Sequence, residues 1–480
     1  MIAGAQRRSS GRAVSLLGAA FSVAALAGGA AFAQPPRVTA YSNLTVVDVR
    51  AGRLLPGSTV IVRGNTIEAM DRSDTVQVPS GAIVVNGKGA FAIPGLWDMH
   101  VHTFNNGQAA GTDNHQRSFA LQIANGVTGV RDMWTDLDDL RLAKTWRLDT
   151  DAGRMIAPRL HGTSPILDGS PRVWPNSTEI RSAQQARDVV DALAAGGAEA
   201  LKVYTRLSRE SFLAITERAK THNLSVVGHL PQSMRLVEVI EAGQKSVEHL
   251  QGLAETCSAL ERAEGVDDRV AQRQRLIDSH DPALCAELFK LMVRKGTWQV
   301  PTLVLHRGRL LAYDPERAAD PTLAYISKQE RTAWRAAHAQ AARNVADDKT
   351  LIVSRNNLLA YMLARIGDMQ RAGVNILAGT DLGNPWVIAG FSLHDELALF
   401  VEGGMTPLEA LRTATWNPAR YFDATATLGS IEGGKLADFV LLEADPLAAI
   451  GNTKKIRAVV TNGQYLDRKA LDALLASASR

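Results

Sequence analysis

Eight short apolar segments, each separated from the next by a helix-like stretch, constrain the fold of this 480-residue chain more than any other feature. They are strand candidates because they are apolar, rich in β-branched residues and bounded by turn residues. Strands that alternate with helices favour a parallel sheet of the α/β class, and eight such units favour a (β/α)₈ barrel. The segments are 92–102, 127–133, 160–167, 200–204, 225–230, 246–250, 298–303 and 375–380.

Both ends of the chain read differently from this middle part. After the N-terminal leader, the chain has short runs of alternating or β-branched residues, each followed by turn residues. Runs of the same kind are found near the C-terminus. We therefore predict a barrel over residues 94–425 and a small β-sandwich formed by residues 38–93 and 426–470 together. Two long charged excursions, 251–297 and 304–373, follow the sixth and seventh strands and should shape substrate choice.

The N-terminus has the pattern of a secretory signal peptide. Arg7, Arg8 and Arg12 precede an apolar run of small residues that ends in Ala31-Phe-Ala33. Cleavage after residue 33 predicts an exported protein, periplasmic or secreted, with no stable membrane insertion; the alternative is an uncleaved anchor. Removing residues 1–33 lowers the formal charge from +4 to +1, because the segment holds three arginines and no acids. Such a chain has no basic patch that would predict nucleic-acid binding.

The chain contains two cysteines, Cys257 and Cys285, both in the first excursion. In an oxidising compartment they can form a disulfide, which would close a loop between two positions 28 residues apart. Two separate buried thiols are the alternative, and the sequence leaves both open.

Polar side chains follow or end several of the predicted strands. His100 and His102 are two positions apart, so they share one face of their strand. In a barrel, the C-terminal ends of parallel strands meet at one mouth, where single polar residues can converge. Taken alone, each is more simply a satisfied polar residue, but as an ordered set they predict a metal site. The further members of the set are Lys202, His229, His249 and Asp381.

Imidazole nitrogens and carboxylate oxygens are ligands that divalent zinc accepts. We expect His100 and His102, with Asp381, to hold one metal ion, and His229 and His249 to hold a second. A lysine ammonium beside two cations would be repelled. A carbamate formed from the amine of Lys202 and carbon dioxide removes this conflict and offers two oxygens that can bridge the metals. The expected cofactors are thus two divalent ions, zinc in the first place, and this carbamate.

The chain resembles the amidohydrolase superfamily, in its imidazolonepropionase-like and Xaa-Pro dipeptidase-like branch, from about residue 44 to 465. The resemblance implies a binuclear metal site at the six positions named above, a carboxylated Lys202, and Asp381 as general acid and base. Imidazolonepropionases lack the carboxylated lysine, so Lys202 favours the peptidase-like members. The motifs that carry the resemblance are Pro94-Gly-Leu-Trp-Asp-Met-His-Val-His102, Leu201-Lys-Val-Tyr204, Gly228-His-Leu-Pro231, Glu248-His-Leu250, Gly379-Thr-Asp381 and Gly434-Lys-Leu-Ala-Asp438.

Three further residues are candidates for supporting roles. Tyr204 lies two positions beyond Lys202, so it should face inward and support an oxyanion or a substrate carboxylate, or else fill the core. Arg206 is next in this register and could bind a carboxylate by two hydrogen bonds, or else lie in solvent. His394, after the eighth strand, is either a supporting or a purely structural histidine.

The sequence predicts a binuclear zinc hydrolase that cleaves an amide bond next to a carboxylate, in a dipeptide or an N-acyl amino acid. An esterase, lactonase or organophosphate hydrolase is the enzymatic alternative, because the same nucleophile attacks those centres. A noncatalytic ligand-binding barrel is the alternative from another class. The sequence leaves open the substrate side chain and the native metal. It also leaves open the oligomeric state, for which a homo-oligomer is one possibility.

Overall fold

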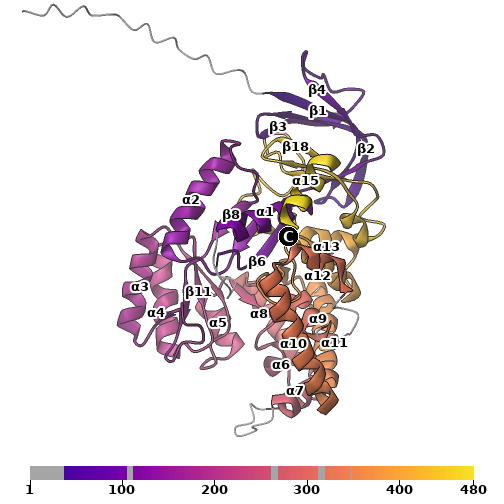
Figure 1. The fold of residues 1–480 in the computed structure, drawn as a ribbon. Helices are drawn as coiled ribbons and strands as arrows, with labels where there is room; N and C mark the ends of the chain where they lie inside the picture. Colours follow the sequence, from indigo (N-terminus) through magenta and orange to yellow (C-terminus); the bar gives the residue numbers. More distant parts are fainter. Residues whose placement is uncertain (1–36, 105–111, 261–268, 312–318, 348, 480) are drawn as a thin grey trace, which may run out of the picture. The chain divides into compact units, whose positions relative to one another are not determined.

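The computed structural model describes residues 37–104, 112–260, 269–311, 319–347 and 349–479 (Figure 1). The predicted signal peptide lies outside these residues. None of the helices in the described part is long and apolar enough to cross a membrane.

The two ends of the described chain pair in one eight-stranded sheet. Its order is β18-β17-β16-β5-β1-β2-β3, with β4 beside β1, and antiparallel pairing of β5 with β16 joins the N-terminal strands to the C-terminal ones. The sheet has its own apolar cluster, which contains Tyr41, Leu44 and Phe439. The predicted joining of the two ends is present, whereas a two-layered sandwich remains a prediction. The strands are β1 (Val38–Asp48), β2 (Arg53–Arg63), β3 (Thr66–Arg72), β4 (Ile83–Asn86), β5 (Phe91–Pro94), β16 (Phe439–Leu442), β17 (Ile456–Thr461) and β18 (Gln464–Asp467).

The middle of the chain forms two parallel sheets, with the orders β6-β7-β8 and β10-β9-β11-β12-β13-β14-β15. The third predicted strand, 160–167, is divided into β8 and β9, and Pro165 stands between them. Proline has no N–H to donate to a ladder, which explains this interruption. The strands are β6 (Leu96–Val101), β7 (Val127–Asp132), β8 (Arg159–Gly162), β9 (Ile166–Asp168), β10 (Thr178–Glu179), β11 (Ala200–Val203), β12 (Ser225–Gly228), β13 (Ser246–Glu248), β14 (Trp298–Val300) and β15 (Asn375–Ile376).

Backbone hydrogen bonds link these two sheets at both of their ends. Ser164 N donates to Ala200 O over 2.8 Å, between the segment after β8 and the start of β11. At the other end, Met99 N donates to Ala378 O over 2.9 Å, between β6 and the segment after β15. The parallel strands, linked in this way and separated by helices, form a TIM-barrel-like fold.

Helices connect consecutive strands, and several begin and end at the residues that local chemistry favours. The side chain of Ser208 caps α4 by accepting a hydrogen bond from Ser211 N over 3.1 Å, and α5 ends at the left-handed Gly243. The helices between the strands and beyond the last one are α1 (Thr112–Ala124), α2 (Leu137–Asp151), α3 (Ala183–Ala195), α4 (Arg209–Thr221), α5 (Leu236–Ala242), α12 (Phe391–Glu402), α13 (Pro407–Thr413), α14 (Trp416–Tyr421), η3 (Ile450–Lys454) and α15 (Arg468–Ala478).

The two long excursions are helical, as their sequence pattern predicts. Helices α7, α9 and α10 all pack against α11, and this group lies beneath α12 and α13 in the view of Figure 1. The excursion helices are α6 (Leu253–Thr256), α7 (Arg269–Asp278), α8 (Pro282–Lys295), α9 (Leu303–Leu311), η2 (Pro321–Tyr325), α10 (Lys328–Asp347) and α11 (Thr350–Arg371).

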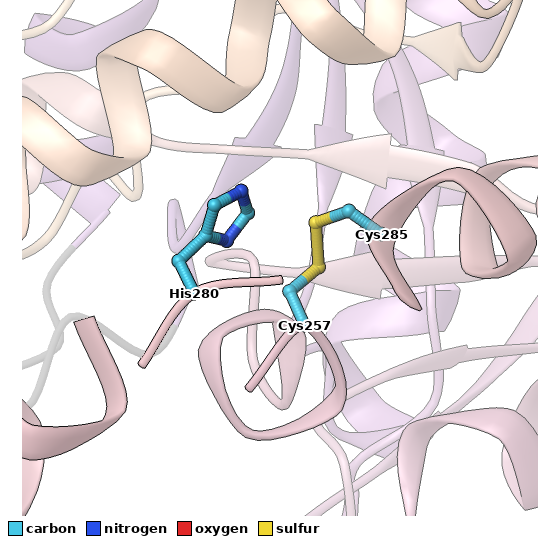
Figure 2. A group of neighbouring side chains, drawn as sticks. All are labelled: Cys257, His280 and Cys285. Carbon is cyan, nitrogen blue, oxygen red and sulfur yellow. A yellow bond between two sulfur atoms is a disulfide. The ribbon is translucent and has the colours of Figure 1, made fainter. Parts of the chain in front are cut away.

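Cys257 and Cys285 form a disulfide, with their Cα atoms 4.6 Å apart (Figure 2). Cys257 follows α6 directly and Cys285 lies in the first turn of α8. Of the two alternatives that the sequence leaves open, the structure contains the disulfide.

Candidate metal centre

Six candidate side chains come together at the C-terminal ends of the parallel strands. His100 lies in β6 and His102 follows this strand, while Lys202 lies in β11. The other three follow their strands within a few residues: His229 after β12, His249 after β13 and Asp381 after β15. They converge because strand order in the sheets follows the chain and all of these strands point the same way.

Asp381 lies at the middle of the group. Its Oδ1 atom is 3.3 Å from His100 Nε2 and 3.0 Å from His102 Nε2. Its Oδ2 atom is 4.0 Å from His249 Nδ1, and His249 Nε2 lies 3.1 Å from His229 Nε2. His100, His249 and Asp381 each offer one ligand atom within 4.8 Å of the other two. This is a spacing at which a shared metal ion can be held.

Neighbouring side chains orient three of the four imidazole rings. Nδ1 of His100 bonds Glu248 Oε2 over 2.7 Å, and Nδ1 of His249 bonds Thr302 Oγ1 over 2.7 Å. Nδ1 of His229 lies 3.2 Å from Thr205 Oγ1. With Nδ1 engaged in this way, Nε2 of each ring is directed to the centre, as is usual for histidines that bind metals.

Two of the candidate ligands have strained backbones. His249 and Asp381 have φ angles of 62° and 61°, in the left-handed region that non-glycine residues seldom adopt. Backbone hydrogen bonds hold both: His249 N donates to Val300 O and Asp381 N to His100 O, each over 2.8 Å. Strain of this kind is concentrated at functional sites, where surrounding structure imposes it.

Lys202 is buried, and its Nζ atom has no hydrogen-bond partner among the described residues. Burial lowers the pKa of its amine to about 8, against the attraction of Glu248 and Asp381. Gly228 on the next strand has φ of 124°, and a Cβ there would lie 2.4 Å from Val203 O and 2.9 Å from Lys202 Cδ. Lys202 therefore occupies a space that only a glycine neighbour leaves open.

The protonation of the group suits metal binding. Burial lowers the pKa of His102, and lowers that of His229 and His249 well below the usual value, so these rings are neutral. Burial opposes ionisation of Asp381, but the surrounding imidazoles hold its pKa well below the usual range. Neutral imidazoles and an ionised carboxylate are the forms that bind divalent metals.

Buried polar atoms without a partner also fit bound metals. Within the described residues, His100 Nε2, His102 Nδ1 and Lys202 Nζ make no hydrogen bond. Such atoms are costly in a protein interior unless something satisfies them. Of these, His100 Nε2 is a predicted ligand atom and Lys202 Nζ is the nitrogen of the predicted carbamate. Imidazole nitrogen and carboxylate oxygen together form a donor set that zinc accepts.

A cavity of about 290 Å³ opens onto this group. Trp134 and Trp174, with ring centroids 6.0 Å apart, contribute to its wall. Tyr204 stacks on His229, with centroids 4.0 Å apart, and its hydroxyl accepts a hydrogen bond from Trp174 Nε1 over 2.9 Å. The lining comprises His102, Trp134, Ile166, Trp174, Lys202, Tyr204, His229, His249, Gln251, Leu305, His306, Arg309, Asp381, Gly383 and Asn384.

Arg206 and His394 lie elsewhere. Arg206 is not among the residues lining this cavity, and its Nη1 atom donates to Pro171 O over 2.6 Å. The alternation that predicted an inward Arg206 ends with β11 at Val203. His394 is buried between Thr453 Oγ1 and Asn125 O, each 3.0 Å from one ring nitrogen, and so connects structural elements away from the site.

The sequence interpretation missed Arg309 and His306, which line the cavity from α9. No local pattern marks them, because they lie in a long excursion whose position depends on packing. It also assigned no role to Arg131 and Glu248, whose buried ion pair lies behind His100 with Nη2 3.1 Å from Oε1. Charged residues inside predicted buried strands were the available signal for that pair.

Comparison with known proteins agrees with this architecture. Residues 91–466 match the sequence profile of the amidohydrolase family. The ochratoxinase of Aspergillus niger is 23% identical over 418 residues, which cover 76% of this chain and 73% of that protein.

Two solved structures share the fold. Bottromycin amidohydrolase has a TM-score of 0.70 and 23% identity, with 93% of this chain and 91% of that one covered. A Xaa-Pro dipeptidase with bound methionine in its active site has a TM-score of 0.63 and 18% identity, with 90% and 100% covered.

Proposed function

This chain belongs to the amidohydrolase family, and we propose that it hydrolyses an amide bond next to a carboxylate, in a dipeptide or an N-acyl amino acid. The convergence of His102, His229, His249, Asp381 and Lys202 on one cavity, with His100 beside them, carries this proposal. The names of its relatives add support, since they include a dipeptidase, an amidohydrolase and an ochratoxinase. Membership of this family makes the protein a hydrolase of the amidohydrolase type.

We propose two divalent metal ions as cofactors, with zinc as the expected metal. His100, His102 and Asp381 would hold one ion, and His229 and His249 the other. When bound, such ions supply a nucleophilic hydroxide at neutral pH and polarise the substrate carbonyl.

Lys202 contributes to this site as a carbamate. Its neutral amine adds to carbon dioxide with formation of an N–C bond and loss of one proton, which leaves a carbamate whose single negative charge is shared by two oxygens. The burial of Lys202 and the reduced pKa of its amine, about 8, favour the neutral form that this step needs.

Asp381 moves the proton. Its carboxylate accepts the proton of the attacking water and passes it to the amide nitrogen, which leaves readily only when protonated. Its position in the middle of the histidine group, 3.0 Å from His102 Nε2, places it next to the site of attack.

Arg309 and Tyr204 are the groups that we propose for the substrate carboxylate, in place of Arg206. Both line the cavity. Burial lowers the pKa of the Arg309 guanidinium, Asp381 opposes this shift, and the positive charges of Arg355 and Arg273 add to it. The positive charges of these three interacting guanidinium groups favour an anionic substrate.

Turnover of Xaa-Pro dipeptides and N-acyl amino acids by zinc-loaded protein, with and without a chelator, tests the activity. We expect chelator-sensitive hydrolysis of at least one of these amide classes. Hydrolysis confined to esters or lactones would favour the alternative chemistry, and no turnover of either class would contradict an enzyme.

The role of Arg309 is tested separately. Arg309→Met should raise KM for a substrate with a free carboxylate more than for the same substrate as its amide. Arg307→Met is the matched control, because Arg307 lies on the same helix and pairs with Glu402 over 2.8 Å instead of lining the cavity. Equal effects of Arg309→Met on both substrates would contradict the assignment.

The barrel and the export of the chain are further proposals. The bonds from Ser164 to Ala200 and from Met99 to Ala378 support closure of eight strands into a (β/α)₈ barrel. The Cys257–Cys285 disulfide supports an oxidising compartment, and thus cleavage after residue 33 and a periplasmic or secreted protein. The intact mass of the secreted protein tests this, since a mass that includes residues 1–33 would contradict cleavage.

A further inference from the structure

A second cavity, of about 470 Å³, adjoins the metal centre. It shares the lining residues His249, Gln251 and His306 with the first cavity, so these three side chains lie at the boundary between the two. Its volume is within the range of about 300–1,000 Å³ that is typical of small-molecule sites. The cavity lies among the loops after β12 and β13 and the helices α6, α7, α9 and α11.

The walls of this second cavity are largely apolar. Leucine and methionine side chains dominate the lining, while charged residues are few, namely Glu255 on α6 and Arg273 on α7. An apolar wall binds an apolar group by removing its surface from water. The apolar lining residues are Leu230, Pro231, Met234, Leu250, Leu253, Ala254, Leu260, Leu276, Leu358 and Met362.

The disulfide region holds one side of this cavity in place. Figure 2 shows His280 beside the Cys257–Cys285 bridge, and His280 Nδ1 lies 3.2 Å from the hydroxyl of Tyr361, a lining residue on α11. Cys257 N donates to Leu253 O over 2.9 Å, so the bridge also anchors the end of α6 that lines the cavity. A preformed wall lowers the entropy lost when a ligand binds.

His306 separates the two cavities. Burial, with the charge of Arg309 beside it, lowers its pKa to about 3, so its ring is neutral at physiological pH. Its Nε2 atom is buried and has no hydrogen-bond partner in the described part of the chain. A neutral ring at this place can contact an apolar chain and still offer one hydrogen bond to a polar atom next to it.

We infer that the second cavity binds a bulky apolar acyl group on the carbonyl side of the scissile amide. The inference rests on the proposed amide hydrolysis and adds the substrate class: N-acyl amino acids with a long alkyl or aromatic acyl group. Arg309 and Tyr204 in the first cavity place the carboxylate of the amino acid there. The acyl group on the other side of the carbonyl then extends past His306 into the apolar space.

The test compares N-acetyl- and N-octanoyl-L-phenylalanine as substrates of the zinc-loaded, full-length mature protein. Each methylene that enters an apolar site should raise kcat/KM about fourfold until the site is full. We expect the octanoyl substrate to have a kcat/KM at least tenfold above that of the acetyl substrate. A ratio near one in the wild-type protein, with both substrates hydrolysed, would overturn the inference and leave the proposed function standing.

Leu276→Trp should fill the cavity, because Leu276 lines it from α7 at a position that is only partly buried. We expect this variant to lower the octanoyl-to-acetyl ratio at least tenfold. Leu358→Trp, also partly buried on α11, provides a second variant in case the first does not fold. Val353→Trp is the matched control, since Val353 lies on α11 outside the cavity with 54% of its surface exposed, and should keep the wild-type ratio. An unchanged ratio in both folded cavity variants would overturn the inference.

Calorimetric titration with octanoate and acetate separates this inference from the proposed function. Octanoate should bind more tightly than acetate to the wild-type protein, and Leu276→Trp should reduce that difference. If no amide is hydrolysed but this binding difference is found, the proposed function fails and the apolar site stands. If octanoate binds no better than acetate, the inference fails whatever the turnover.

Discussion

Two clusters of buried charge lie in the same barrel-like interior and differ in how completely they are satisfied. Behind His100, the Arg131 guanidinium directs its donors to Met99 O, Ser246 Oγ, Tyr421 Oη and both oxygens of Glu248. At the mouth, Lys202 Nζ has no partner among the described residues. Burial of charge is tolerated when every donor is paired, as around Arg131. The difference teaches that the hydrogen bonds of the Arg131 cluster are complete within the protein, whereas those of the Lys202 cluster are incomplete among the described residues, as the proposed carbamate requires.

The largest expected effect on activity comes from Asp381, at the centre of the incomplete cluster. Asp381→Asn keeps the shape of the side chain but removes its proton acceptor. Loss of general acid–base catalysis alone lowers kcat by about 10²–10⁴-fold. Steady-state kinetics with parallel elemental analysis checks this, and a near-wild-type kcat in a variant that still binds metal would remove Asp381 from the mechanism.

The largest expected effect on stability comes from the complete cluster. Arg131→Met leaves the buried Glu248 without its ion-pair partner, and breaking a buried pair from one side costs about 3–5 kcal/mol. Burial alone would raise the pKa of Glu248, but Arg131 and His100 hold it below the usual range in the wild-type protein. Urea unfolding measures the loss, and a loss below about 1 kcal/mol would show that the two clusters do not differ as described.

In metal-free protein, Lys202→Met should change the free energy of unfolding in the direction opposite to that of Arg131→Met. The substitution replaces a buried amine without a partner by an apolar side chain of similar length, so the free energy of unfolding should rise by about 1–3 kcal/mol. The same variant should lose activity and bind fewer metals when loaded with zinc and bicarbonate. Destabilisation of the metal-free variant, or normal turnover with about two metals bound, would contradict the incomplete cluster.

The smallest expected effect, taken per pH unit, is a pH dependence of stability at Glu396, a buried carboxyl on α12 that accepts hydrogen bonds from Leu303 N and Val304 N. Burial raises its pKa to about 8 in the folded protein. Between pH 4.5 and 8 the folded state therefore binds more protons at this group than the unfolded state. The contribution of Glu396 to the free energy of unfolding consequently falls as pH rises. The slope is at most about 1.4 kcal/mol per pH unit. Unfolding of wild type and Glu396→Gln across pH 5–8 measures it, and parallel curves would refute it.

The sequence predicted the strands well where local pattern decides the structure. Each of the eight predicted segments contains a strand of the structure, because apolar runs bounded by turns form buried strands largely irrespective of distant context. It was less precise where one residue interrupts a ladder, as Pro165 does between β8 and β9.

What the sequence alone determined about the site is the set of residues at the strand ends. His100, His102 and Asp381 meet because strand direction and side-chain alternation are local properties that chain order preserves. Only the tertiary structure decided the partners of these residues: Glu248 bonds His100 Nδ1, Thr302 bonds His249, and Lys202 Nζ has no hydrogen-bond partner among the described residues.

Tertiary structure alone also decided which parts of the excursions reach the cavities. Arg309 and His306 lie on α9, and Leu276 lies on α7, and these positions depend on how both helices pack against α11. By contrast, Arg206 belongs to the expected register but faces Pro171 O once β11 has ended. Periodicity along a strand extends only as far as the strand itself, whereas contacts between distant helices are set by the packing of the whole chain.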